Sequence, residues 1–103
     1  MNIKAEQTIN FLKPFFENDG AIDEVRIFGS QARGNYNENS DVDLAIISDN
    51  LNNVKFGLLH RIAVDNQLDV DFVYTNWEKL KLSKYELDVN YWIYREGVTI
   101  WKR

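Results

Sequence analysis

Two aspartates separated by a single residue are the first sign of chemistry in this sequence. Asp41 and Asp43 stand in the run Ser-Asp-Val-Asp-Leu-Ala-Ile-Ile, which predicts a β-strand. Because alternate residues of a strand project from one face, the two carboxylates should lie side by side. Carboxylates that close repel each other and require a cation, and their oxygens suit Mg²⁺. We therefore predict that Asp41 and Asp43 bind metal.

A third carboxylate stands in the next expected strand, Val70-Asp71-Phe72-Val73-Tyr74. If the two strands are neighbours, about 4.8 Å separates them and Asp71 can share the site. Asp69 has the same parity and stays open as an alternative, although the apolar residues around Asp71 favour Asp71. Three carboxylates can hold two Mg²⁺ ions roughly 3.5–4 Å apart, the arrangement for in-line phosphoryl or nucleotidyl transfer. Asp71 would then help to activate the attacking hydroxyl group.

A glycine-serine corner precedes these carboxylates and is suited to phosphate. Gly29 follows an expected strand, so the backbone there can approach an anion closely. Ser30 adds a hydroxyl donor at the start of a short expected helical turn, where backbone N–H groups are free. Arg33 lies one turn later and can donate to a phosphate, although an ion pair with Asp41 or Glu38 is an equal alternative. We predict that Gly29, Ser30 and Arg33 bind the triphosphate of a nucleotide.

Helices and strands at regular intervals must position these side chains. The order is typical of an α/β (α+β) domain, with a small mixed sheet packed against helices. Pro14 should kink or end the first helix, and Asn52 or Asn53 should cap the third. The expected helices are 2–18, a turn at 30–34, about 53–66 and 83–96, and the expected strands are 22–28, 41–47, 70–74 and 98–101.

Composition limits the remaining classes of function. A chain of 103 residues predicts a single domain over residues 1–103. Without cysteine and with His60 as its one histidine, the sequence offers no thiolate or histidine-cluster metal site. A net charge of −4 does not favour a nucleic-acid partner. The apolar runs are too short to span a membrane, so we expect a cytoplasmic protein.

The combined motif resembles the signature of the DNA polymerase β-like nucleotidyltransferase superfamily. Gly-Ser-Gln-Ala-Arg-Gly followed by Ser-Asp-Val-Asp-Leu is similar to its minimal nucleotidyltransferases. The resemblance implies a palm-like core, two Mg²⁺ ions, ATP as substrate, and AMP transfer with release of pyrophosphate. It also implies that Gly29 and Ser30 bind the triphosphate and that Asp41, Asp43 and Asp71 hold the metals.

The resemblance further implies a partner, because minimal nucleotidyltransferases are commonly paired with a helical toxin of the HEPN type. There the nucleotidyltransferase is the antitoxin, and its members have been linked to adenylylation of a toxin tyrosine. The alternatives are a non-catalytic antitoxin that masks its toxin, or transfer to a small molecule such as an aminoglycoside. Tyr91, Trp92 and Tyr94 are too closely spaced for one helical face, so some of them are candidates for a protein interface. The sequence leaves open whether the chain forms homo-oligomers.

Overall fold

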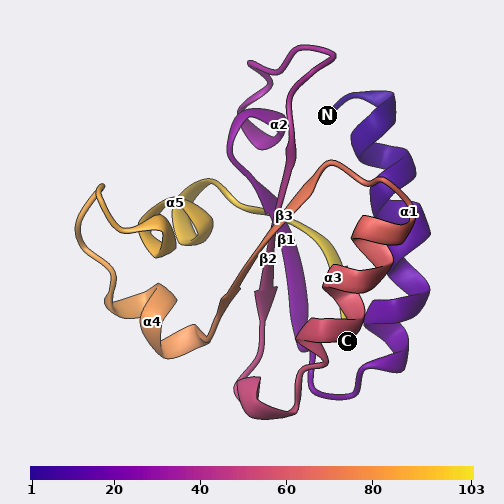
Figure 1. The fold of residues 1–103 in the computed structure, drawn as a ribbon. Coiled ribbons are helices and arrows are strands. Elements are labelled where there is room, and N and C mark those ends of the chain that lie inside the picture. Colours follow the sequence, from indigo (N-terminus) through magenta and orange to yellow (C-terminus); the bar gives the residue numbers. More distant parts are fainter.

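The computed structural model describes all residues from 1 to 103 as a mixed α/β structure (Figure 1). None of its helices combines the length and apolar character needed to cross a membrane. The elements are α1 (Ile3–Asn18), β1 (Glu24–Phe28), α2 (Ser30–Arg33), β2 (Val42–Ile47), a 3₁₀ turn (Leu51–Asn53), α3 (Phe56–Asp65), β3 (Val70–Thr75), α4 (Trp77–Leu82), α5 (Val89–Glu96) and β4 (Val98–Lys102).

The four strands form one mixed sheet in the order β3-β2-β1-β4. β1 pairs antiparallel with both β2 and β4, whereas β2 and β3 run parallel. The parallel pair requires a crossover, and α3 supplies it. The end of β1 and the beginnings of β2 and β3 therefore meet at one edge of the sheet (Figure 1).

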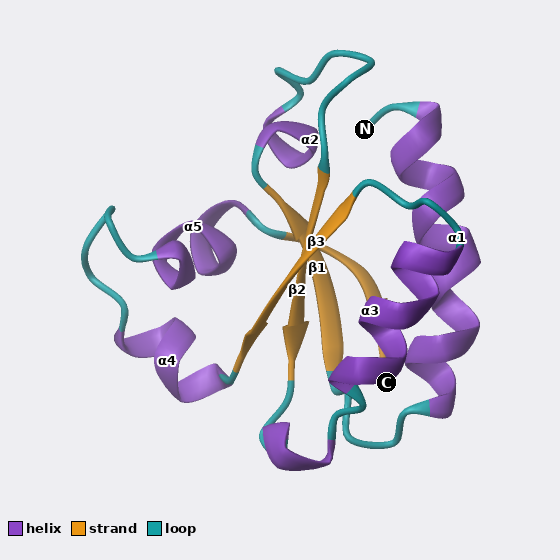
Figure 2. Cartoon of the chain, in the orientation of Figure 1, coloured by secondary structure: helices purple, strands orange, loops and turns teal.

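Helices cover both faces of the sheet. Figure 2 shows α1 and α3 on one face and α4 with α5 on the other. Alternation along β2 explains the division: Leu44 and Ile46 belong to the cluster that includes α1, whereas Ala45 and Ile47 pack with Ile93 of α5. The α1 cluster is the larger, with 12 buried residues against 5.

The expected order of elements is confirmed, with corrections at the helices. Pro14 does not end the first helix, which continues to Asn18. Pro14 is exposed, so the carbonyl group that it leaves unpaired can meet water, and the buried Leu12 and Phe16 on either side keep the helix on the core. The prediction that Asn52 or Asn53 caps the third helix is wrong, because these residues form a 3₁₀ turn and α3 begins at Phe56.

The chain after β3 differs most from expectation. The helix expected over residues 83–96 begins only at Val89, where Asp88 caps it by accepting a hydrogen bond from the Asn90 backbone. Leu87 is fully exposed in the segment before it, and Ile93 is the residue that α5 buries. The expected extended tail is β4, which pairs with β1.

Candidate active site

The structure brings two of the three predicted carboxylates onto neighbouring strands in direct register. Asp43 of β2 is the pairing partner of Asp71 of β3. By alternation, both project from the face that Ala45 occupies, which is the face covered by α4 and α5. Asp41 lies immediately before β2 and is exposed, and Asp43 is half-buried. The carboxylate pair therefore lies at the edge of the sheet where β2 and β3 begin.

Asp69, the alternative third carboxylate, has a different role. It lies outside β3, which begins at Val70, so strand alternation does not govern its direction. Its carboxylate forms an ion pair of 2.8 Å with Nζ of Lys4, which belongs to α1 on the opposite face of the sheet. The geometry favours Asp71 over Asp69.

Gly29 forms the corner between β1 and α2, directly against Asp43. Its φ of +73° and ψ of −149° fall in a region that side chains rarely allow. A Cβ atom at this position would lie 2.6 Å from Oδ2 of Asp43. Glycine is thus required twice, once for the turn and once for the close approach of a carboxylate to the backbone.

Negative charge is concentrated around Asp43. Burial raises the pKa of the Asp43 carboxyl group, and the charges of Asp71 and Asp41 raise it further. The guanidinium of Arg33 acts in the opposite direction. Such crowding disfavours the ionised form of Asp43 and would be relieved by a bound cation.

The other two residues predicted to bind phosphate, Ser30 and Arg33, lie on α2, next to this corner. Ser30 begins the helix and is partly exposed, and the Arg33 N–H donates to the Gly29 carbonyl at 3.1 Å, which closes the turn. The Arg33 side chain extends toward α5, where its Nη1 lies 3.5 Å from Oε2 of Glu96. Arg33 is therefore close enough to influence Asp43 and is held by a residue from the far end of the sequence.

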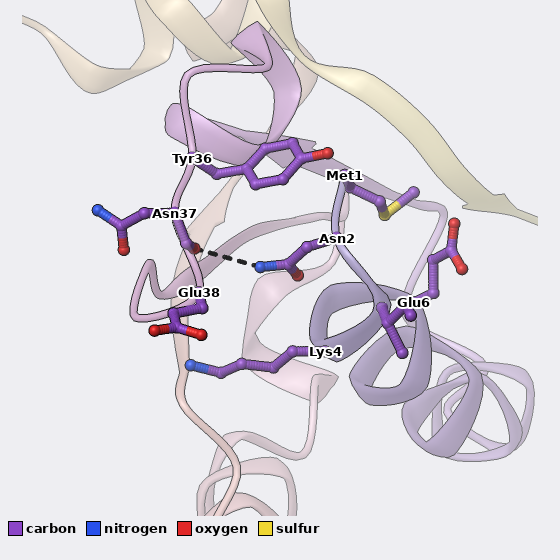
Figure 3. Close-up of a pocket in the computed structure, with 8 residues that line it drawn as sticks. Met1, Asn2, Lys4, Glu6, Tyr36, Asn37 and Glu38 are labelled. Atoms are coloured by element: carbon purple, nitrogen blue, oxygen red, sulfur yellow. Dashed lines mark hydrogen bonds between the residues drawn. The ribbon is translucent and has the colours of Figure 1, made fainter.

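The first residues of the chain hold the loop that leads into Asp41. Nδ2 of Asn2 donates to the Asn37 carbonyl at 3.3 Å, and Nζ of Lys4 donates to the Ser40 carbonyl at 3.4 Å. Between this loop and α1 lies a pocket of about 530 Å³, which Tyr36 and Met1 help to line (Figure 3). None of the three candidate carboxylates lines it. The pocket belongs to the support of the loop and not to the carboxylate cluster.

Carboxylate oxygens suit a hard cation, but the three carboxylates are not arranged as a complete set of metal ligands. No group of three or more histidine, cysteine or acidic side chains is arranged to bind an ion. Burial and the neighbouring charges of Asp71 and Asp41 raise the pKa of Asp43, and a cation bound there would favour its ionised form. The carboxylate oxygens of Asp41, Asp43 and Asp71 are nevertheless the type of ligand that Mg²⁺ prefers, and Asp41 and Asp71 are exposed.

Two residues near the site were not found from the sequence. Gln31, although polar, is buried on α2, and its Oε1 accepts the Asn2 N–H at 3.1 Å, which joins α2 to the start of α1. Glu96 stands 63 positions after Arg33 in the sequence, and the packing of α5 brings the two together. The pattern Glu-Gly at the end of a helix marks the turn, but nothing local indicates the partner.

The chain is similar to known proteins in sequence and in fold. The family model described as polymerase beta, nucleotidyltransferase matches residues 10–103, and no curated protein matches the chain significantly. A structure assigned as a nucleotidyltransferase of Sulfolobus solfataricus is similar, with a TM-score of 0.60, 20% identity, and coverage of 97% of this chain and 85% of that one. A toxin–antitoxin complex with AMP-PNP has a TM-score of 0.56 and 23% identity, and the match covers 96% of this chain and 73% of that one. The MntA–HepT toxin–antitoxin complex has a TM-score of 0.50 and 20% identity, and the match covers 100% of this chain and 74% of that one. At these identities the structures establish a shared fold.

Proposed function

Because this chain belongs to the polymerase β nucleotidyltransferase family, we propose that it transfers AMP from ATP to a hydroxyl group and releases pyrophosphate. The observation that carries the proposal is the register of Asp43 with Asp71, beside a glycine corner that leaves no room for a side chain. Two carboxylates in register beside a glycine turn suit a metal-bound nucleotide.

The residues have separate roles in this proposal. Asp41, Asp43 and Asp71 would hold Mg²⁺, which supplies positive charge for the phosphates and lowers the pKa of a bound hydroxyl group. Gly29 allows the triphosphate to approach the backbone, and Ser30 donates a hydrogen bond to it. Catalysis would rest on positioning and electrostatic stabilisation, since no side chain here forms a covalent intermediate.

We propose Asp71 as the carboxylate nearest the acceptor. It is exposed and lies on β3, an edge strand of the sheet, whereas Asp43 is half-buried between its neighbours. An incoming hydroxyl group can reach Asp71 from solvent, and an ionised carboxylate there accepts its proton. In the reaction the acceptor oxygen forms a bond to the α-phosphorus, the bond to the bridging oxygen breaks, and pyrophosphate leaves.

The acceptor that we propose is a tyrosine of a helical HEPN-type toxin, which would make this chain an antitoxin. The resemblance of the Gly29–Gly34 and Ser40–Leu44 motifs to minimal nucleotidyltransferases supports this. Toxin–antitoxin complexes, one of them with AMP-PNP, are among the structures of similar fold. Exposed apolar side chains beside α4 and α5 offer a contact surface on the same face of the sheet as Asp43: Leu82, Tyr85, Leu87 and Tyr94.

These same exposed residues favour a second candidate, an antitoxin that works by binding alone. One experiment separates the two. The chain and its helical partner are co-expressed, and label transfer from α-labelled ATP and rescue of growth are both measured for wild type, Asp43→Asn and the matched control Asp69→Asn. Chemistry predicts that Asp43→Asn loses both label and rescue, whereas Asp69→Asn keeps both. Rescue by Asp43→Asn without label would establish masking instead.

A further inference from the structure

Glu96 contacts Arg33 from outside the motif that contains the candidate site. It is the last residue of α5, and its Oε2 lies 3.5 Å from Nη1 of Arg33. The same oxygen is buried and has no hydrogen-bond partner. A buried carboxylate oxygen without a hydrogen bond costs free energy, so its place beside a single cation requires an explanation.

The backbone around Glu96 is held firmly. Nη1 of Arg26 lies 3.4 Å from the carbonyl oxygens of both Ile93 and Tyr94 and donates to them. The Gly97 N–H donates to the Ile93 carbonyl at 3.1 Å, and a Cβ atom at Gly97 would overlap that same oxygen. Ile93 itself is fully buried. The end of α5 is therefore a rigid support from which the Glu96 carboxylate reaches α2.

Arg33 lies between this support and the carboxylate cluster. Arg33 lies on α2, one turn after the Gly29 corner that approaches Asp43, and its side chain is 44% exposed, so it remains accessible to a ligand. The contact with Glu96 uses Nη1, which leaves the other nitrogens of the guanidinium free to donate to a phosphate. A long side chain held at one end of its guanidinium loses less freedom on binding an anion.

From this geometry we infer that Glu96 is a positioning residue that holds Arg33 in place to bind the triphosphate of ATP. The inference rests on the proposed function, because it takes the Gly29 corner as the nucleotide site. Glu96 does not touch the nucleotide itself. Its effect is expected in the affinity for ATP and not in the rate of the chemical step.

A double-mutant cycle on ATP binding tests this inference. Titration calorimetry of ATP with Mg²⁺ is performed on wild type, Glu96→Gln, Arg33→Ala and the double variant. Glu86→Gln is the control, since Glu86 is exposed and has no ion pair. We expect Glu96→Gln to raise the Kd about two- to fivefold, the effect of a partly exposed ion pair. In the Arg33→Ala background the same change should have no further effect, and Glu86→Gln should bind like wild type.

Three results would overturn the inference. If Glu96→Gln weakens ATP binding equally with and without Arg33, the role of Glu96 is structural. If Glu96→Gln tightens ATP binding, Glu96 only repels the phosphate, and unchanged binding would show that it has no role. Glu96→Asp keeps the charge and serves as the second variant if Glu96→Gln is unfolded; it should bind ATP more tightly than Glu96→Ala. Equal binding by these two would contradict the inference. A wild-type chain that binds ATP but transfers no AMP contradicts the proposed function alone, whereas one that binds no ATP contradicts both.

Discussion

The Gly29→Ala substitution places one methyl group where the Asp43 carboxylate already lies. The added Cβ would be 2.6 Å from Oδ2, far inside ordinary van der Waals contact. Because this oxygen is the end of a short side chain, Asp43 can rotate away at little cost in stability. Its carboxylate then moves away from the Gly29 corner, although the backbone pairing of Asp43 with Asp71 is kept.

Gly29→Ala should affect stability through the backbone of residue 29 and activity through the displaced Asp43 carboxylate. The backbone of Gly29 occupies a region essentially restricted to glycine, and a side chain there costs about 1–3 kcal/mol. For a domain of this size, each kcal/mol lowers Tm by roughly 4–8 °C. Displacement of a reacting group by an ångström reduces the rate by about 100-fold. Gly29→Ala should therefore melt well below wild type and lose about 100-fold or more in AMP transfer.

Gly34→Ala is the matched control. Gly34 also has positive φ, +81°, but a Cβ atom there meets nothing within 4 Å. We expect it to lose about 1–2 kcal/mol through backbone strain and to keep its activity. Differential scanning calorimetry gives the stabilities, and label transfer from α-labelled ATP gives the rates. If Gly29→Ala transfers AMP as fast as Gly34→Ala, the close approach to Asp43 has no catalytic meaning and the reasoning is refuted.

Three further predictions follow from the charges and buried groups. Asp71→Asn should abolish AMP transfer, whereas Asp69→Asn should keep it and lose at most about 1 kcal/mol in urea unfolding, because it removes only the exposed ion pair with Lys4; the reverse result would exchange their roles. Burial and neighbouring carboxylates raise the pKa of Asp43, so ionisation of this group as the pH rises destabilises the fold. Asp43→Asn should therefore have a higher Tm than wild type at pH 7 in chelator, with the difference shrinking toward about pH 3.5, below the unfolded pKa; a lower Tm at pH 7 would contradict the pKa direction. Burial raises the pKa of Tyr74 to about 12 and leaves its hydroxyl group without a partner, so Tyr74→Phe should be neutral or gain up to about 1 kcal/mol in urea unfolding; a loss above 1 kcal/mol would reveal a partner.

Local patterns were sufficient for the strands that carry the carboxylates. Alternation around Asp43 and the apolar run after Asp71 each produce their signal within a few residues, and both strands formed as expected. The sequence alone could not establish that Asp43 stands opposite Asp71, because this requires β2 and β3 to be neighbours. The order of the strands depends on the crossover through α3. The choice between Asp69 and Asp71 likewise depended on a tertiary contact, the ion pair with Lys4.

Sequence reasoning failed where the deciding contact is distant. A helix was expected over residues 83–96, but its actual start at Val89 depends on Asp88, whose side chain caps α5. Which side of α5 is buried depends on the sheet beneath it, and this selected Ile93. The same packing places Glu96 beside Arg33, a pairing that no spacing along the chain could indicate.

Parallel pairing of β2 with β3 makes the carboxylate site a late product of synthesis. The ribosome delivers Asp41 and Asp43 first, and Asp71 emerges only after the whole of α3. Contacts between strands separated by a crossover form slowly, and a slip of one residue would turn Asp71 to the opposite face. A nascent or misregistered chain thus lacks its third carboxylate at the site. We therefore expect nucleotide transfer only from molecules whose sheet is complete.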